Sequence, residues 1–240
     1  MLKMPKLQYV SYKDGRLAYR EAGKGPDLFF LHGMNGSSRS WFHIFEVLAP
    51  SFHVVAWDAP SFGASDVFGD KIEDYVDAAK ALMQAVKIRE AIVVGHSMGG
   101  VIATQLAADR ECSTAGLVLS STHLGFGLPA SAPLMARYAA RIDNIESEGV
   151  NTAYGLERAK RSTPEGTSQA VIRFLAEIAT GARIEGIRDG GRMSQEADNA
   201  KIGPNVRVPV LILSGGKDTV ISPDMHGALV STFPKAKQVV

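Results

Sequence analysis

A serine at position 97 has the sequence surroundings of a catalytic nucleophile. It stands at the centre of residues 95–99 (Gly-His-Ser-Met-Gly), which follow the apolar run Ile92–Val94 and precede the helix-compatible segment Val101–Asp109. A Gly-x-Ser-x-Gly pattern between a strand and a helix puts the serine at a sharp turn, where the two backbones come too close for larger side chains. We therefore predict that Ser97 attacks the acyl carbon of a substrate.

A carboxylate suited to assist this serine appears later in the chain. A serine hydroxyl is a weak nucleophile and needs a base, usually histidine, that a carboxylate orients. Asp218 follows the apolar stretch Val208–Leu213, and such groups sit at the carboxyl ends of the strands in a doubly wound sheet. A turn aspartate that binds its own backbone is the alternative. Position and the chain order, Ser97 before Asp218, favour the catalytic role.

Two backbone N–H groups are expected to stabilise the oxyanion that forms during the attack. One belongs to Met98, the residue after the nucleophile, where the start of a helix adds a positive dipole end. The other is assigned to Met34, in the loop His32–Ser38 that follows the apolar strand Asp27–Leu31. His32 is a conceivable base, but a histidine beside the glycine of such a loop favours a structural role.

Other motifs in the chain do not predict a second site. Ser65 belongs to a shaped turn, and Gly215-Gly216-Lys217 lacks the spacing of a phosphate-binding loop. The histidines show no zinc-type pair. We therefore expect neither a cofactor nor a metal.

Composition and charge limit the kinds of partner and the cellular location that we expect for this protein. The 240 residues are 45% hydrophobic and 21% charged, with a net charge of +1, so we expect neither nucleic acid nor a membrane as a partner. Cys112 is the one cysteine, which excludes an internal disulfide. The first residues lack the apolar core of a signal peptide, and no apolar run approaches a membrane span. These features predict a cytoplasmic protein with a small-molecule substrate.

Apolar strands alternate with amphipathic helices through the first half of the chain. This rhythm predicts an α/β fold whose doubly wound, mostly parallel sheet is covered on both faces. A hairpin is expected to join Gln8–Lys13 to Arg16–Glu21 at the turn Asp14-Gly15. The other expected strands are Asp27–Leu31, His53–Trp57, Ala91–Val94, Ala115–Ser120 and Val208–Leu213, and the expected helices are Ser40–Leu48, Lys71–Val86 and Pro223–Phe233.

The alternation stops after Ser121. Residues 124–200 show no convincing strand, and we interpret them as an all-helical cap inserted before the penultimate strand of a core formed by 1–123 and 201–240. Helical patterns cover Pro133–Glu146, Asn151–Lys160, Thr167–Ala179 and Gly191–Ala200. Four arginines of this segment, Arg137, Arg141, Arg158 and Arg161, could contact an anionic substrate, although solvated helix surface is the commoner role.

Four motifs together resemble the α/β-hydrolase superfamily, in its order and spacing. They are His32-Gly33, Asp58-x-Pro60-x-x-Gly63-x-Ser65, residues 95–100 and Gly216-Lys217-Asp218. The resemblance covers nearly the whole chain and implies the cap-bearing branch of serine hydrolases, which includes carboxylesterases, enol-lactonases and carbon–carbon-bond hydrolases. It implies cleavage of an ester, lactone or related acyl bond of a small, largely apolar substrate, with hydrolysis of a carbon–carbon bond in aromatic catabolism as the alternative. The serine at the elbow argues against dehalogenases and epoxide hydrolases, which use aspartate there. Ser61 stands where the superfamily usually has glycine.

The catalytic histidine is the main departure from this resemblance. The superfamily's histidine follows the last strand and would lie beyond Val240, whereas Lys235–Val240 looks like only the start of that strand. One explanation is that the last strand and helix are truncated, and a C-terminal companion fragment of the same protein is then conceivable. Alternatively, His123 or His226 acts as the base, or the protein is a non-catalytic ligand-binding relative.

Overall fold

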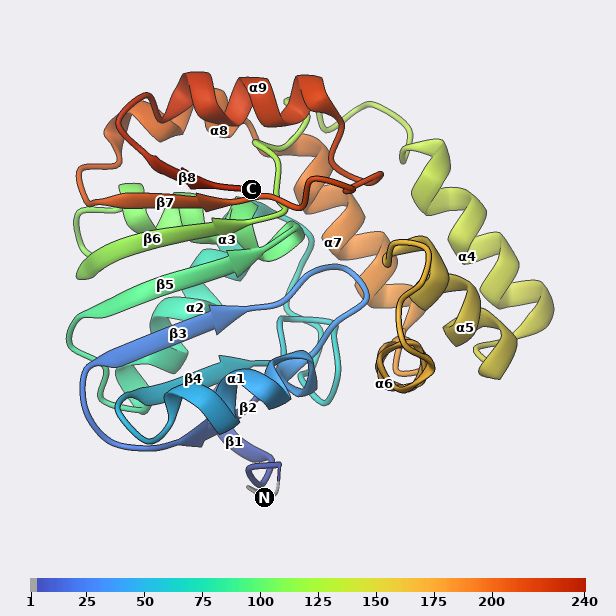
Figure 1. The fold of residues 1–240 in the computed structure, drawn as a ribbon, viewed down its shortest axis with the longest axis horizontal. Coiled ribbons are helices and arrows are strands. Elements are labelled where there is room, and N and C mark those ends of the chain that lie inside the picture. The colour runs from blue at the N-terminus through green and yellow to red at the C-terminus, as the bar shows by residue number, and fades with distance from the viewer. Residues whose placement is uncertain (1–3) are drawn as a thin grey trace.

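The computed structural model describes residues 4–240, which form one eight-stranded sheet with helices on both faces (Figure 1). The strand order is β1-β2-β4-β3-β5-β6-β7-β8. Only the pairs β1–β2 and β2–β4 are antiparallel. The strands are β1 Gln8–Tyr12, β2 Gly15–Ala22, β3 Asp27–Leu31, β4 His53–Trp57, β5 Ala91–His96, β6 Thr114–Ser120, β7 Val210–Leu213 and β8 Lys237–Val239. The predicted fold class, α/β with a mostly parallel sheet, is confirmed.

Side chains of successive strand residues enter two separate cores. In β3, Phe29 and Leu31 belong to the larger core, while Leu28 and Phe30 belong to the smaller core on the opposite face. This alternation follows from the two-residue repeat of a strand. Because both faces are covered, the strand sequence is apolar throughout, and this is the pattern from which a buried parallel sheet was expected.

Helices cover the two faces unequally. The larger core packs against α2 (Ile72–Ala85), α3 (Met98–Ala108) and α9 (Pro223–Thr232). The smaller core packs against α1 (Phe42–Leu48), which a 3₁₀ turn, η1 (Ser38–Trp41), precedes. The helix expected from Ser40 therefore begins as a tighter turn, because Ser37 caps that turn and its hydroxyl accepts from the Arg39 N–H.

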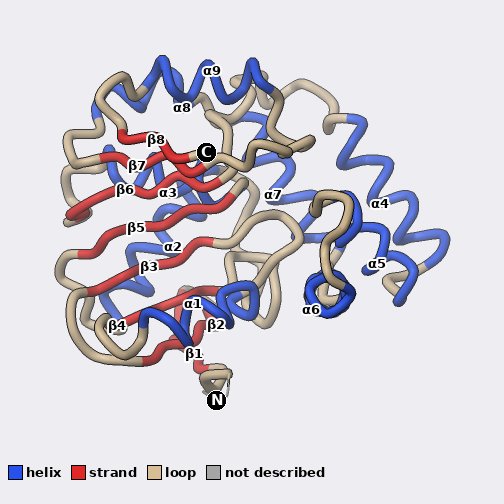
Figure 2. Tube along the Cα trace, viewed as in Figure 1, coloured by secondary structure: helices blue, strands red, loops and turns tan. Residues whose placement is uncertain are grey.

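Between β6 and β7 lies a segment of helices, here called the helical insert. It contains α4 (Ala136–Glu148), α5 (Thr152–Arg161), α6 (Gln169–Ala179) and α7 (Ile184–Glu196), and then α8 (Asn199–Ile202) and η2 (Gly203–Asn205) lead back to the sheet. Figure 2 shows α4, α5 and α6 beyond the carboxyl ends of the strands, with α7 between them and the sheet. Within residues 4–240, no helix is long and apolar enough to cross a membrane.

The predicted helix Gly191–Ala200 had the wrong bounds. The structure shows α7 beginning at Ile184 and a separate α8 beginning at Asn199. Glycines at 186, 190 and 191 lower the intrinsic helix propensity of α7 and hide its start from the sequence pattern. Close packing explains these glycines. A Cβ on Gly186 would lie 2.7 Å from the Ser61 carbonyl oxygen, and one on Gly191 would lie 2.8 Å from Cγ of Tyr138.

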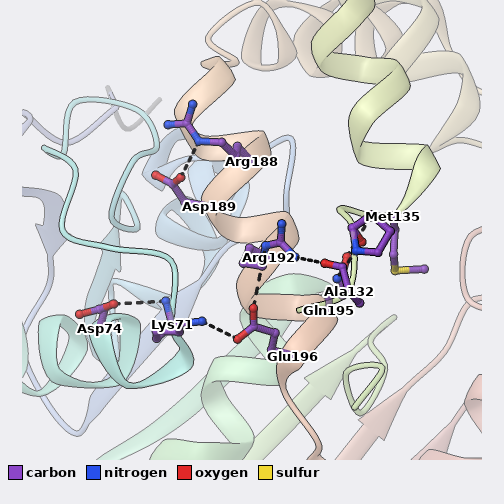
Figure 3. A network of polar contacts seen from close by, with 10 residues as sticks. Lys71, Asp74, Ala132, Met135, Arg188, Asp189, Arg192, Gln195 and Glu196 are labelled. Atoms are coloured by element: carbon purple, nitrogen blue, oxygen red, sulfur yellow. Dashed lines mark hydrogen bonds and ion pairs between the residues drawn. The ribbon is translucent and has the colours of Figure 1, made fainter. Parts of the chain in front are cut away.

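Polar contacts fix α7 to the segment before α4 and to the core (Figure 3). The Gln195 side chain accepts a hydrogen bond of 2.8 Å from the Met135 N–H. Glu196 forms an ion pair of 2.7 Å with Lys71, the residue before α2. The first contact joins α7 to the start of the helical insert, and the second joins it to the core at the start of α2.

Candidate active site

Ser97 sits in a strained turn between β5 and α3. Its φ of 51° and ψ of −120° lie in a region that residues other than glycine rarely adopt. Hydrogen bonds hold this conformation: the Ser97 N–H donates to the Ser120 carbonyl at 3.1 Å, and the Ser97 carbonyl accepts from the Thr122 hydroxyl at 2.6 Å. The surrounding structure therefore over-determines the turn, which is the usual condition for strain to persist.

The glycines that flank Ser97 are required by close backbone contacts. A Cβ on Gly95 would lie 2.4 Å from the Gly99 carbonyl oxygen, and one on Gly99 would lie 2.1 Å from the Leu31 carbonyl oxygen. No real Cβ tolerates such distances, so only glycine fits at both positions. The sequence pattern around Ser97 thus has a direct steric cause.

A cavity of about 1340 Å³ lies between the carboxyl ends of the strands and the helical insert. Ser97, Met34, Met98 and Asp218, the four residues predicted to form the site, all line it. They come from the turn after β5, the loop after β3 and the turn after β7. The topology thus gathers residues far apart in sequence around one space.

Two free N–H groups belong to residues that line this cavity. Among residues 4–240, neither the Met34 N–H nor the Met98 N–H donates a hydrogen bond. Met98 is the first residue of α3, where the helix dipole is positive. The loop of Met34 passes so close to the nucleophile that a Cβ on Gly33 would lie 3.0 Å from Cβ of Ser97. These groups can stabilise negative charge on an oxygen bound next to Ser97.

Asp218 combines a turn contact with a free carboxylate oxygen. Its Oδ1 accepts hydrogen bonds from the N–H groups of Val220 (2.8 Å) and Ile221 (3.0 Å), as the turn alternative expects. Its Oδ2 accepts no hydrogen bond from the described part of the chain. The turn contacts therefore fix the side chain, and Oδ2 remains available to orient a histidine.

The His32 ring is built into the core. Its Nε2 accepts from the Ala59 N–H at 2.9 Å, and its Nδ1 donates to the Gly33 carbonyl at 2.8 Å. Burial lowers the pKa of His32, so the ring is neutral at pH 7. With both nitrogens engaged, His32 has no lone pair with which to take a proton from Ser97.

The motif from Asp58 to Ser65 folds into a hydrogen-bonded turn that contacts the loop His32–Ser38, here called the oxyanion loop because the N–H of its Met34 is predicted to bind the oxyanion. Asp58 accepts from the N–H groups of Ser38 at 2.7 Å and Ala64 at 2.9 Å, and its carbonyl accepts from the Ser65 hydroxyl at 2.6 Å. Ser61, the residue that departs from the family pattern, has a φ of 67°, and its hydroxyl donates to Asp189 of α7 at 2.7 Å. Serine at this position therefore adopts a backbone conformation that favours glycine, but its hydroxyl forms a contact with the helical insert that glycine could not form.

Neither histidine considered as a substitute base has a suitable environment. His123 lines the cavity, but its Nδ1 accepts from the Gly125 N–H at 3.0 Å. Burial and the nearby Arg137 lower its pKa to about 4, so it is a weak base. His226 contacts the Ser214 hydroxyl at 3.0 Å through Nδ1 and is not among the cavity-lining residues.

His96 is a cavity residue to which sequence reasoning gave no role. Its side chain faces the cavity. The surrounding protein partly desolvates the ring, and this desolvation lowers the pKa of His96. The negative charge of Asp218 opposes the shift, and His32 adds to it. Its position directly before Ser97 in the sequence was the signal that could have placed His96 in the cavity. The four arginines of the helical insert named above also line the cavity.

Comparison with known proteins agrees with this architecture. A family model described as the alpha/beta hydrolase fold matches residues 26–240. An uncharacterized protein of Mycobacterium tuberculosis is 28% identical over 90% of this chain and 69% of its own length.

Two solved structures share the fold. An enol-lactonase from Burkholderia xenovorans has a TM-score of 0.84 at 22% identity, covering 97% of this chain and 90% of its own. An esterase from Thermogutta terrifontis has a TM-score of 0.83 at 22% identity, covering 98% and 89%.

Proposed function

Since the chain belongs to the alpha/beta hydrolase fold family, we propose that it is a serine hydrolase that cleaves a carboxylic ester, lactone or related acyl bond. One observation carries the proposal: Ser97 is held at a strained elbow, in a cavity it shares with two free N–H groups and an available carboxylate oxygen. The esterase and the enol-lactonase with the same fold are consistent with this reaction class.

In the proposed reaction, the Ser97 hydroxyl oxygen attacks the carbonyl carbon of the bound substrate. The carbonyl oxygen becomes an oxyanion, which accepts hydrogen bonds from the N–H groups of Met34 and Met98. The bond to the leaving oxygen breaks, that oxygen takes a proton, and an acyl-enzyme remains. Water then attacks the same carbon, the bond between that carbon and the Ser97 oxygen breaks and releases the acid, and a proton from the water, moved by the base, restores the Ser97 hydroxyl.

The base in this proposal is a histidine that Asp218 orients through Oδ2. His32 has both ring nitrogens in hydrogen bonds, His123 is a weak base, and His226 is outside the cavity lining. The family resemblance assigns this role to a histidine after the last strand, and that assignment stays a prediction. Asp218 would hold the correct tautomer and stabilise the imidazolium formed when Ser97 attacks.

The cavity favours a substrate with an apolar part. Its wall includes Met34, Trp41, Tyr138, Leu175 and Ile178, whose side chains offer apolar surface from both the core and the helical insert. Contact with such surface stabilises a bound hydrocarbon by about 25 cal/mol per Å² removed from water. We propose that the helical insert acts as a cap that selects the substrate, while the sheet carries the reacting groups.

Covalent labelling of the full-length protein by a fluorophosphonate tests the proposal. We expect wild type to be labelled on Ser97 and Ser97→Ala to lose all labelling. Ser162→Ala is the matched control, because Ser162 also lines the cavity but belongs to the helical insert, and it should be labelled like wild type. Labelling that persists in Ser97→Ala would overturn the assignment. A folded wild type that binds ester substrates without being labelled would favour the non-catalytic, ligand-binding alternative.

A further inference from the structure

Arg141 differs from the other cavity-lining arginines of the helical insert in lacking any compensation for its charge. Arg158 and Arg161 both pair with Glu157, the second at 3.7 Å. The exposed Arg137 lies 4.4 Å from the ring centre of Phe126, a cation–π contact. In the part of the chain that the structure describes, no carboxylate lies within 4.0 Å of the Arg141 guanidinium.

Neutral groups hold the Arg141 guanidinium in a fixed position. Its Nη2 donates to Oδ1 of Asn35 at 2.7 Å and to the hydroxyl of Tyr154 at 2.8 Å. Tyr154 is buried, and Asn35 follows Met34 in the oxyanion loop. One nitrogen of the guanidinium is therefore used for anchoring, close to the loop that we expect to hold the oxyanion.

The remaining donors of Arg141 are unused. Nε is buried without a hydrogen-bond partner, and Nη1 donates to no group among residues 4–240. A half-buried guanidinium without a counter-charge is unfavourable, because two hydrogen bonds to neutral groups replace only part of the hydration that burial removes. Its anchoring keeps it pre-organised, so an arriving anion would not have to order the side chain.

We propose that Arg141 binds a carboxylate of the substrate, so that the enzyme acts on acyl compounds with one free carboxylate remote from the scissile bond. This inference rests on the proposed serine-hydrolase function. The guanidinium supplies one uncompensated positive charge, which matches one carboxylate. The other charges of the lining are mixed: Glu157 is paired with two arginines, Glu165 and Asp218 are acidic, and Lys217 is an exposed cation. The apolar wall would hold the chain between the carboxylate and the ester.

Hydrolysis of paired esters by the full-length protein tests this inference. The monoethyl esters of glutaric and adipic acid carry the free carboxylate, and the corresponding diethyl esters are neutral controls. We expect kcat/KM of wild type to favour the monoesters by about tenfold or more, because a charge-assisted hydrogen bond forms only with them. Arg141→Gln should lose this preference, and Arg141→Lys, which keeps the charge without the planar fork, should keep part of it.

Arg173→Gln is the matched control, because it removes the same charge from an exposed position of α6 outside the cavity lining. Its preference should equal that of wild type. Equal losses on monoesters and diesters in Arg141→Gln would overturn the inference, since they would show that Arg141 only supports the oxyanion loop through Asn35.

Calorimetric binding to Ser97→Ala separates this inference from the proposed function. If the monoester binds at least tenfold more tightly than the diester and Arg141→Gln removes the difference, the carboxylate site stands even if wild type hydrolyses neither compound. If the two bind equally, the site is refuted even if both are hydrolysed. Thermal unfolding of each variant checks that Arg141→Gln remains folded.

Discussion

Strain at Ser97, the proposed nucleophile, costs the protein stability. A serine at φ 51° is disfavoured because its Cβ crowds the backbone, and such a residue costs about 1–3 kcal/mol. Gly95 and Gly99, two positions either side of it, use the smallest side chain because a Cβ at either would lie too close to backbone. At position 97 glycine would relieve the strain, but it would lack the hydroxyl that the proposed reaction requires.

Of two replacements of Ser97, by glycine and by alanine, only the glycine variant should therefore relieve the strain and stabilise the fold. Ser97→Gly relieves the strain, whereas Ser97→Ala keeps a Cβ and the strain with it. After the entropic cost of glycine, we expect the free energy of unfolding of Ser97→Gly to exceed that of Ser97→Ala by about 1 kcal/mol. Thermal unfolding should show a difference of roughly 2–4 °C, with both variants inactive. A glycine variant no more stable than the alanine variant would argue against strain at this position.

The buried His123 predicts loss of stability in mild acid. Its folded pKa of about 4 lies below the unfolded value of 6.5, so between these values the unfolded chain binds a proton that the folded chain does not. The free energy of unfolding should therefore fall as pH drops from about 6.5 to 4, by up to about 1.4 kcal/mol per pH unit, and level off below pH 4 with respect to this group. Chemical unfolding at several pH values measures the slope.

Two variants assign that slope to His123. His123→Gln should flatten it, and His43→Gln should not, because the His43 side chain is 72% exposed and keeps a similar environment when the chain unfolds. An unchanged slope in His123→Gln would show that other groups cause the acid sensitivity. His32 and His96, whose pKa values are also lowered by burial, act in the same direction and limit how flat the slope can become.

Sequence reasoning could single out Ser97 and Asp218 because the backbone around each leaves a local sequence pattern. The turn around Ser97 demands glycines at fixed positions, and Asp218 follows a recognisable strand. Arg141 left no such pattern. Arg141 stands out because no carboxylate of the described residues pairs with it, and a sequence alone does not show which carboxylates lie close to which arginines.

At the scale of elements, α7 shows where a sequence pattern misleads. Propensity alone argues against a helix that contains three glycines, yet the helix forms because tertiary packing outweighs that cost. The sequence pattern also misplaced the start of β7, which begins at Val210 rather than Val208. Pro209 has no N–H to donate to the neighbouring strand, although its carbonyl accepts from the Leu117 N–H.

Two glycine-to-alanine variants test this account of α7. Gly186→Ala gains helix propensity but brings a Cβ to 2.7 Å from the rigid Ser61 carbonyl, so we expect destabilisation of about 1–3 kcal/mol. Gly227→Ala in α9 is the matched control, because nothing lies within 4 Å of the added Cβ, and it should stabilise by about 0.5–1 kcal/mol. Denaturant unfolding measures both. Stabilisation in both variants would contradict close packing as the reason for Gly186.

At the scale of the whole molecule, the alternation of apolar strands and amphipathic helices was enough to predict the sheet, its covered faces and the helical segment between β6 and β7. The size and lining of the cavity were not predictable. They depend on how α4 and α5 pack above Ser97, and this packing rests on single contacts such as that between Tyr138 and Gly191. One extra methyl group at such a contact would change the shape of the site.

The position of the helical insert also has a consequence for the order in which the protein folds. β6 and β7 pair at Leu117 and Val210, so β7 can join the sheet only after the whole insert has turned back on itself. Closing a long loop costs entropy, and pairings between distant segments form slowly. The elbow of Ser97, built from the adjacent elements β5 and α3, does not wait for that closure. We therefore expect the nucleophile to acquire its geometry early in refolding, while Asp218 arrives only with the last strands.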